Sequence, residues 1–204
     1  MMISNLALWI VVLIKEFSQA KQRLGPALAP EQRCELAGQN ARLALQAAAV
    51  GDRVLAVCGG PDAADLAAAA GADEVILEPI AEGQNQAARR GIEHVLAARG
   101  SAVLLLSSDL PLITEAAVAE LLAAAVELDS PAVLAAPAIG RGGTNALYLS
   151  PPDVIDLHFG HDSLTKFRYE AEQRGIRFAL HEAQELALDL DQPSDLALLA
   201  EIEG

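Results

Sequence analysis

The sequence is short of cysteine, of aromatic residues and of basic residues, and each shortage excludes a class of protein. The two cysteines, Cys34 and Cys58, form neither a metal-binding spacing nor a disulfide framework, which favours a reduced cytoplasmic setting. Lysine and arginine number 14 against 28 aspartates and glutamates, for a formal net charge of −14. Such a field repels polyanions, so we expect no nucleic-acid partner. A small anionic ligand is compatible with the composition if the few cations gather at one site.

Long apolar runs are also missing. Leu6–Ile14 is apolar, but it is far shorter than the roughly 20 residues that a membrane-spanning helix needs. Ala27 to Ala29 resemble a signal-peptidase site, yet Met1 to Asn5 carry no positive side chain and basic residues precede Ala27. We therefore expect a cytoplasmic protein with no membrane partner, in which Leu6–Leu13 is a buried first strand.

What the sequence does contain is an alternation of short apolar runs and helical patterns, with 52% hydrophobic and only 3% aromatic residues. The expected strands are Leu6–Leu13, Arg53–Cys58, Glu74–Leu77, Ala102–Ser107, Ala132–Ala136, Ala146–Ser150 and Ile176–Leu180. The expected helices are Glu31–Ala49, Ala63–Ala70, Gln84–Ala98, Glu115–Glu127, Ser163–Arg174 and Ser194–Ile202. This order predicts an α/β fold with a mostly parallel sheet. No linker or repeat divides the chain, so we expect residues 1–204 to form one domain.

Ligands of such sheets bind beyond the carboxyl ends of the strands, so the loops after the strands are the places to search. The loop after the first strand carries three cations, Lys15, Lys21 and Arg23. In an acidic protein they either neutralise the phosphates of a nucleotide or are ordinary solvated side chains. The loop has no glycine-rich phosphate cradle, which argues against a dehydrogenase or a P-loop kinase.

Acidic residues follow two other strands. Asp109 follows the apolar run Val103–Leu106 after two serines and precedes a rigid Leu-Pro turn, a placement that suits a Mg²⁺ ligand or a helix cap. Thr114 is better placed for the capping role. Asp189 and Asp191 alternate along an extended segment and therefore point to one side. We expect Asp195 in the first turn of the last helix, where the helix dipole favours an acid.

Two glycine-containing stretches complete the candidates. Gly140–Asn145 lets backbone amides approach an anion, and Ser163 is expected to begin a helix whose N-terminus attracts phosphate or carboxylate. The alternative is a pair of surface turns. His158 and His161 lack the further ligands that a metal site of their own would need.

Together these loops resemble the 2-phospho-L-lactate guanylyltransferase family, whose bacterial members include phosphoenolpyruvate guanylyltransferases. The matching segments are Lys15, Ala20–Leu24, Glu82–Ala87, Asp109–Pro111, Gly143–Leu147, Phe159–Ser163 and Leu188–Asp191. Asp-Leu-Pro recurs in many nucleotidyltransferases, whereas Gly-Thr-Asn-Ala-Leu followed by Phe-Gly-x-x-Ser is far more specific. The resemblance implies one nucleotidyltransferase domain, glycosyltransferase-A-like and Rossmann-related, with a mixed, mostly parallel central sheet flanked by helices.

The resemblance also implies a reaction and a set of site residues. GTP and a small phosphorylated carboxylic acid would give a guanylylated acid and pyrophosphate, in coenzyme F-420 biosynthesis. Asp109, Asp189 and Asp191 would hold Mg²⁺, and Lys15, Lys21 and Arg23 would face the GTP phosphates. Thr144, Gly160 and Ser163, beside Asn145 of the same motif, would hold the acid. Gly83 and Asn85 would lie near the nucleoside.

Two positions depart from the family pattern. A histidine often follows the Phe-Gly-x-x-Ser serine, whereas this chain has Lys166 and Arg168 there, and either is a candidate replacement cation. Gln84 stands where leucine is common, which bears on nucleoside contacts. The acceptor is therefore left open between phosphoenolpyruvate, 2-phospho-L-lactate and 3-phospho-D-glycerate.

Other functions remain open at this point. A molybdenum-cofactor or sugar-phosphate nucleotidyltransferase would usually carry a Gly-Gly-rich signature after the first strand, and Ile14–Leu24 lacks it. A non-catalytic nucleotide-binding protein would not need all three acids. Homodimers are common among cytosolic enzymes, so a homodimer is compatible with either function.

Overall fold

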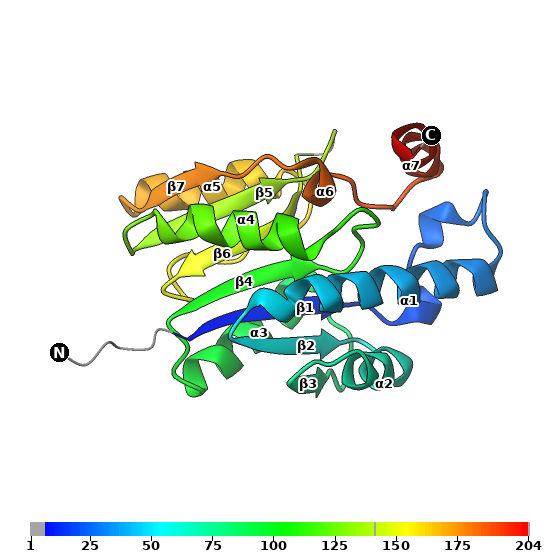
Figure 1. Ribbon diagram of the computed structural model, residues 1–204, viewed down its shortest axis with the longest axis horizontal. Coiled ribbons are helices and arrows are strands. Elements are labelled where there is room, and N and C mark those ends of the chain that lie inside the picture. The colour runs from blue at the N-terminus through cyan, green and yellow to red at the C-terminus, as the bar shows by residue number, and fades with distance from the viewer. Residues whose placement is uncertain (1–6, 141, 204) are drawn as a thin grey trace.

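The computed structural model describes residues 7–140 and 142–203, and the strands of these residues form one sheet (Figure 1). The strands are β1 (Leu8–Ile14), β2 (Arg53–Cys58), β3 (Glu74–Leu77), β4 (Ala102–Ser107), β5 (Ala132–Pro137), β6 (Thr144–Ser150) and β7 (Arg177–Leu180). Their order across the sheet is β3-β2-β1-β4-β6-β5-β7. All neighbours pair in parallel except β6, which is antiparallel to both β4 and β5. The sheet is therefore mixed and mostly parallel, as predicted.

The helices fall close to the predicted ranges. They are α1 (Pro30–Ala47), α2 (Pro61–Ala69), α3 (Gln84–Ala97), α4 (Glu115–Val126), α5 (Ser163–Gln173), α6 (Gln184–Ala187) and α7 (Pro193–Glu203). The short helix α6 and the 3₁₀ turns η1 (Phe17–Gln19), η2 (Gln22–Leu24) and η3 (Ala48–Val50) were not predicted, because so few residues show no periodicity. The expected first strand begins at Leu6, which lies outside the described residues.

Helices cover both faces of the sheet, which explains why its central strands are continuous apolar runs. Along β1, Ile10 and Val12 pack in one core cluster with α1, α2 and α4, whereas Val11 and Leu13 pack in another with α3 and α5. Figure 1 shows α1 and α4 on the near side of the sheet and α3 and α5 behind it. Among the described helices none is both long and apolar enough to cross a membrane.

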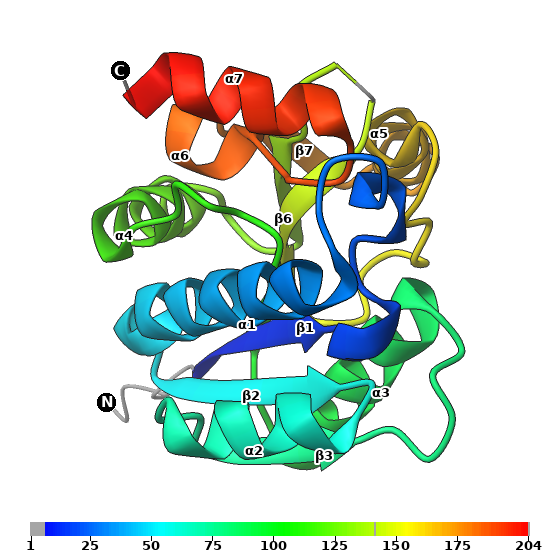
Figure 2. The ribbon, with the colours of Figure 1, turned by 90° about the vertical axis from the view of Figure 1, so that its right-hand side faces the viewer.

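The strand directions decide which loops meet. Since β6 runs against the other strands, its first residues lie at the edge where β1, β2, β3, β4 and β5 end. In both views the segment after β1 lies at the same end of the molecule as α7 (Figures 1 and 2). A Cβ on Gly59, just after β2, would come within 2.9 Å of the Glu16 nitrogen, so glycine lets the loops after β1 and β2 touch. This edge is where the site residues gather.

Candidate active site

A pocket of about 1050 Å³ opens at the carboxyl edge of the sheet. Residues from the loops after β1, β2, β3 and β4, from the start of β6 and from the segment before α7 line it. The predicted site residues in its wall are Lys15, Arg23, Gly83, Asp109, Thr144, Asn145, Gly160, Ser163, Asp189 and Asp191. Lys21 and Asn85 are not part of that lining. One cavity thus gathers most of the predicted site residues, which come from six separate segments of the sequence.

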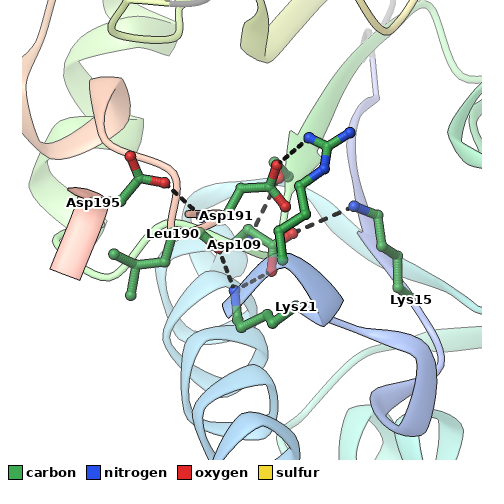
Figure 3. A network of polar contacts seen from close by, with 8 residues as sticks. Lys15, Lys21, Asp109, Leu190, Asp191 and Asp195 are labelled. Carbon is green, nitrogen blue, oxygen red and sulfur yellow. Dashed lines mark hydrogen bonds and ion pairs between the residues drawn. The ribbon is translucent and has the colours of Figure 1, made fainter. Parts of the chain in front are cut away.

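Asp109 is held by two lysines (Figure 3). Lys21 Nζ donates to Asp109 Oδ1 at 2.7 Å and to the Leu190 carbonyl at 3.0 Å, and its side chain is only 1% exposed. Lys15 Nζ lies 3.6 Å from the other oxygen of Asp109 and is largely exposed. Lys21 therefore does not face the pocket as the prediction for phosphate binding required. It joins the end of β4 to the segment before α7.

These lysines determine the charge of Asp109. Burial on its own raises the pKa of Asp109, but the positive charges of Lys21 and Lys15, with the hydrogen bond from Lys21, outweigh it and hold the pKa below its usual 3.8. The carboxylate is therefore ionised at neutral pH and is an electron-pair donor to any cation in the pocket.

A second ion pair lies beside the first. Arg23 Nη1 contacts Asp191 Oδ2 at 2.7 Å, with the Arg23 side chain 71% exposed. Asp195, in the first turn of α7 as predicted, accepts hydrogen bonds from the backbone nitrogens of Asp191 and Gln192 at 2.8 and 2.7 Å. The start of α7 thus helps to hold the backbone of Asp191 in place.

The predicted cap is also confirmed, because Thr114 Oγ1 accepts from the Ala117 nitrogen at 3.1 Å at the start of α4.

The three acids predicted as metal ligands line one pocket without forming a closed ligand set. Within residues 7–140 and 142–203, no group of three or more histidine, cysteine, aspartate or glutamate side chains is arranged to hold a metal. Lysine and arginine nitrogens contact Asp109 and Asp191 instead. Carboxylate oxygens are the donors that Mg²⁺ prefers, so the chemistry of the wall fits such an ion. The three-acid site stays a prediction.

Two hydroxyl groups also line the pocket. Ser163, which begins α5 as predicted, donates from Oγ to Thr144 Oγ1 at 3.0 Å, and both side chains are buried. Asn145 donates from Nδ2 to the carbonyls of Leu186 and Ala187 at 2.9 and 3.1 Å. It therefore ties α6 to the start of β6 and keeps Thr144 at the pocket.

Asn85 has a supporting position that was not predicted. Its Nδ2 donates to the Phe159 carbonyl at 3.0 Å, and its Oδ1 accepts from the Phe159 nitrogen at 2.8 Å. Both ends of the amide thus hold the loop that carries Gly160. The expected nucleoside contact of Asn85 stays a prediction, because in this structure the amide is turned to the protein.

The suggested replacement cations lie elsewhere, which corrects that expectation. Lys166 Nζ donates to the His161 carbonyl at 2.7 Å, and the Arg168 guanidinium lies 5.4 Å from the Phe178 ring centroid. Neither residue is among those that line the pocket. His158 lies 3.6 Å from Glu170 and His161 lies 3.0 Å from Asp162.

One pocket residue escaped sequence reasoning. Glu78 follows β3 directly, lines the pocket and is only 7% exposed. Burial raises its pKa and so does the charge of Glu82, while Arg90 opposes them. The same strand-end rule that singled out Asp109 would have found it.

The sequence and the fold of this chain are similar to those of known proteins. Residues 8–202 match the family model described as "Guanylyl transferase CofC like". A phosphoenolpyruvate guanylyltransferase of Rubrobacter xylanophilus is 38% identical over 197 residues, 95% of this chain and 94% of that protein. A 2-phospho-L-lactate guanylyltransferase of Methanothermobacter thermautotrophicus is 33% identical over 194 residues, 91% of this chain and 81% of the other. A solved nucleotidyl transferase from the same organism shares the fold, with a TM-score of 0.66 at 18% identity over 96% of this chain and 97% of that one.

Proposed function

Because this chain belongs to the family of CofC-like guanylyl transferases, we propose that it transfers GMP from GTP to a three-carbon phospho-acid and releases pyrophosphate. The chain is accordingly a nucleotidyltransferase. Its acceptor is phosphoenolpyruvate or 2-phospho-L-lactate, the acids in the names of its relatives. The product belongs to the biosynthesis of coenzyme F-420. The observation that carries the proposal is a single pocket lined both by ion-paired acids and by a pair of hydrogen-bonded hydroxyl groups.

The residues of the pocket suit two anionic substrates. The phosphate oxygen of the acceptor attacks the α-phosphorus of GTP, and this oxygen is already ionised, so no general base is required. Lys15 and Arg23, exposed in the wall, neutralise the phosphates and hold them in line for attack. Thr144 and Ser163 with the Gly160 backbone hold the acid, at the N-terminus of α5.

A divalent cation fits the acidic side of the pocket, and we propose Mg²⁺ held by Asp109 with Asp189 and Asp191. All three carboxylates reach the same cavity, and Asp109 stays ionised because its lysine partners lower its pKa. Such an ion would screen the repulsion between the substrates and stabilise the charge that develops on pyrophosphate. Lys21, which does not line the pocket, supports this arrangement by hydrogen bonding to both Asp109 and the Leu190 carbonyl.

Three further proposals concern the extent of the domain, the location of the protein and its oligomeric state. That residues 1–204 form one nucleotidyltransferase domain is supported by the family match over residues 8–202 and by the single sheet of the described strands. A cytoplasmic location is supported by the two free thiols of Cys34 and Cys58. A homodimer stays a proposal that the sedimentation of the purified chain would test.

The decisive experiment incubates the protein with GTP, Mg²⁺ and each of phosphoenolpyruvate, 2-phospho-L-lactate and 3-phospho-D-glycerate separately. We expect pyrophosphate release with one acid and a product mass equal to that acid plus a guanylyl group. Omission of the acid is the control for GTP hydrolysis. Binding of GTP without turnover on any of the acids would contradict the proposal and favour a nucleotide-binding protein.

A further inference from the structure

Glu78 is an acid at the pocket to which the proposed reaction assigns no role. Its backbone nitrogen donates to the Cys58 carbonyl at 2.9 Å, which extends the β2–β3 ladder by one residue. The backbone of Glu78 is thereby held at the carboxyl edge of the outermost strand on this side, and its side chain lines the pocket. A buried carboxylate needs a hydrogen-bond donor as a partner, because an unpaired buried polar group is costly.

The protein supplies Arg90 as the partner of Glu78, but Arg90 also binds Glu82 and has poor hydrogen-bond geometry toward Glu78. Arg90 Nε lies 3.3 Å from Glu78 Oε1, yet within the described residues neither atom makes a hydrogen bond of acceptable geometry. The other end of the same guanidinium donates to Glu82 Oε2 at 2.9 Å. Glu78 therefore has partial charge compensation and unused accepting capacity. Burial raises its pKa, which reflects the cost of that state.

The distance from the reacting groups suits the far end of a nucleotide. Glu78 follows β3 and Asp109 follows β4, and β2 and β1 lie between them. Three strand spacings of about 4.8 Å separate the two ends by about 14 Å. Gly59, which follows β2, lines the wall between them, and Gly83 of the loop after β3 lines the same pocket, where a Cβ would meet nothing within 4 Å. A nucleotide whose α-phosphate lies at Asp109 can therefore extend its base past these glycines toward Glu78.

We propose that Glu78 selects the base, by accepting hydrogen bonds from the N1–H and the 2-amino group of guanine. This proposal rests on the proposed function, since it places the base of the same nucleotide. A carboxylate has two acceptor oxygens and matches two adjacent N–H donors. Adenine presents a lone pair at N1 and no 2-amino group, so it would leave the buried carboxylate unpaired.

Direct binding of nucleotides to the full chain tests the proposal without turnover. Calorimetry would measure GTP, ITP and ATP with Mg²⁺ and no acceptor acid, since ITP differs from GTP by the missing 2-amino group. Because a hydrogen bond to a charged group is worth about 1.5–3 kcal/mol, we expect GTP to bind about 10- to 100-fold more tightly than ITP. ATP should bind more weakly still.

The variant Glu78→Gln should remove this preference, because an amide turns one donor toward the base. We expect the GTP-to-ITP affinity ratio to fall to about 1, within a factor of 3. Glu82→Gln is the matched control: it makes the same chemical change beside the same Arg90, but its side chain is 50% exposed and does not line the pocket. That variant should keep the wild-type ratio.

Several results would overturn the proposal. An unchanged ratio in Glu78→Gln, or an equal loss in Glu82→Gln, would remove Glu78 from base selection. Equal affinity of the wild type for GTP and ITP would do so even if Glu78→Gln failed to fold. Guanine-selective binding that depends on Glu78, with no turnover on any acid, would contradict the proposed reaction alone. Turnover on one of the acids, together with a GTP-to-ITP affinity ratio that Glu78→Gln leaves unchanged, would contradict this inference alone.

Discussion

Two ion pairs connect the loop after β1 to the acids of the pocket, and they differ in burial and not in length. Lys21–Asp109 and Arg23–Asp191 both have nitrogen–oxygen distances of 2.7 Å. The Lys21 side chain is 1% exposed, whereas that of Arg23 is 71% exposed. An exposed pair contributes little because water and salt compete for it, while removing one partner of a buried pair leaves an uncompensated charge. We infer that the buried pair builds the site and that the exposed cation is available to substrate.

The surroundings of the two cations support this division. Lys21 has a left-handed backbone, with φ of 55°, just before η2, and it also binds the Leu190 carbonyl. The Leu190 nitrogen in turn donates to the Asp109 carbonyl at 3.1 Å. Two contacts thus join the end of β4 to the segment that carries Asp189 and Asp191. Arg23 contacts that segment at the pocket surface, through the side chain of Asp191.

The largest effect should come from the acid of the buried pair. We expect Asp109→Asn to lower kcat by at least about 10³-fold, because an amide neither neutralises Lys21 nor binds a divalent cation as a carboxylate does. Pyrophosphate release would measure the loss, and circular dichroism would show that the fold is retained. Asp65→Asn on the exposed side of α2 is the control. Turnover like that of the wild type would remove Asp109 from the mechanism.

Removing the buried cation should mainly cost stability. Lys21→Met leaves the charge of Asp109 without its closest partner, so we expect a loss of about 3 kcal/mol in the free energy of unfolding. Arg23→Met should lose less than about 1 kcal/mol. Urea denaturation of the two variants under identical conditions would compare them. Equal losses would mean that burial does not distinguish the pairs.

Removing the exposed cation should instead weaken substrate binding. In Arg23→Met we expect the KM for GTP to rise about 5-fold with little change in kcat, equivalent to about 1 kcal/mol of lost attraction to phosphate. Steady-state kinetics at low and high salt would test this, because screening should shrink the difference from the wild type. If the variant lowers kcat and leaves KM unchanged, Arg23 acts on the transition state and not on substrate binding.

The smallest effect should appear in the pH dependence of stability. The pKa of Asp109 is lower in the folded chain than its usual 3.8, so its ion pairs add stability above that pH. The contribution should be lost as the pH falls below 3.8 toward the lowered value. Urea denaturation of the wild type and of Asp109→Asn at a series of pH values should therefore show a difference that narrows in acid. A difference that widened there would contradict the lowered pKa.

Much of the fold and of the pocket could be predicted from sequence. The ranges predicted for β2, β3 and β4 are those observed, because a buried strand between helices is a short apolar run with clear ends. Asp109, Thr144 and Ser163 reached the pocket because they lie at element ends that share one edge of the sheet. Glu78 lies at such an end as well, directly after β3, so the same rule predicts its place at the pocket.

Other features depend on contacts between distant segments. Lys21 and Arg23 are two residues apart in one loop, and no local pattern tells which is buried. Asn85 follows Gly83 closely, yet its amide binds the Phe159 backbone 74 residues away. Lys166 lies near Ser163 in sequence and still points out of the pocket, toward the His161 carbonyl. In each case the partner, and not the residue type, decides the role.

The sequence by itself determined which elements form and which residues stand at their ends, because hydrophobic periodicity and turn chemistry act within a few neighbouring residues. The tertiary structure decided which cation is buried against Asp109, which acids share a wall and which amide supports a loop. Lys21 and Leu190 are 169 positions apart, and their contact exists only because the sheet brings the loop after β1 to the segment before α7. Burial and charge pairing are properties of that meeting, so only the folded chain can assign them.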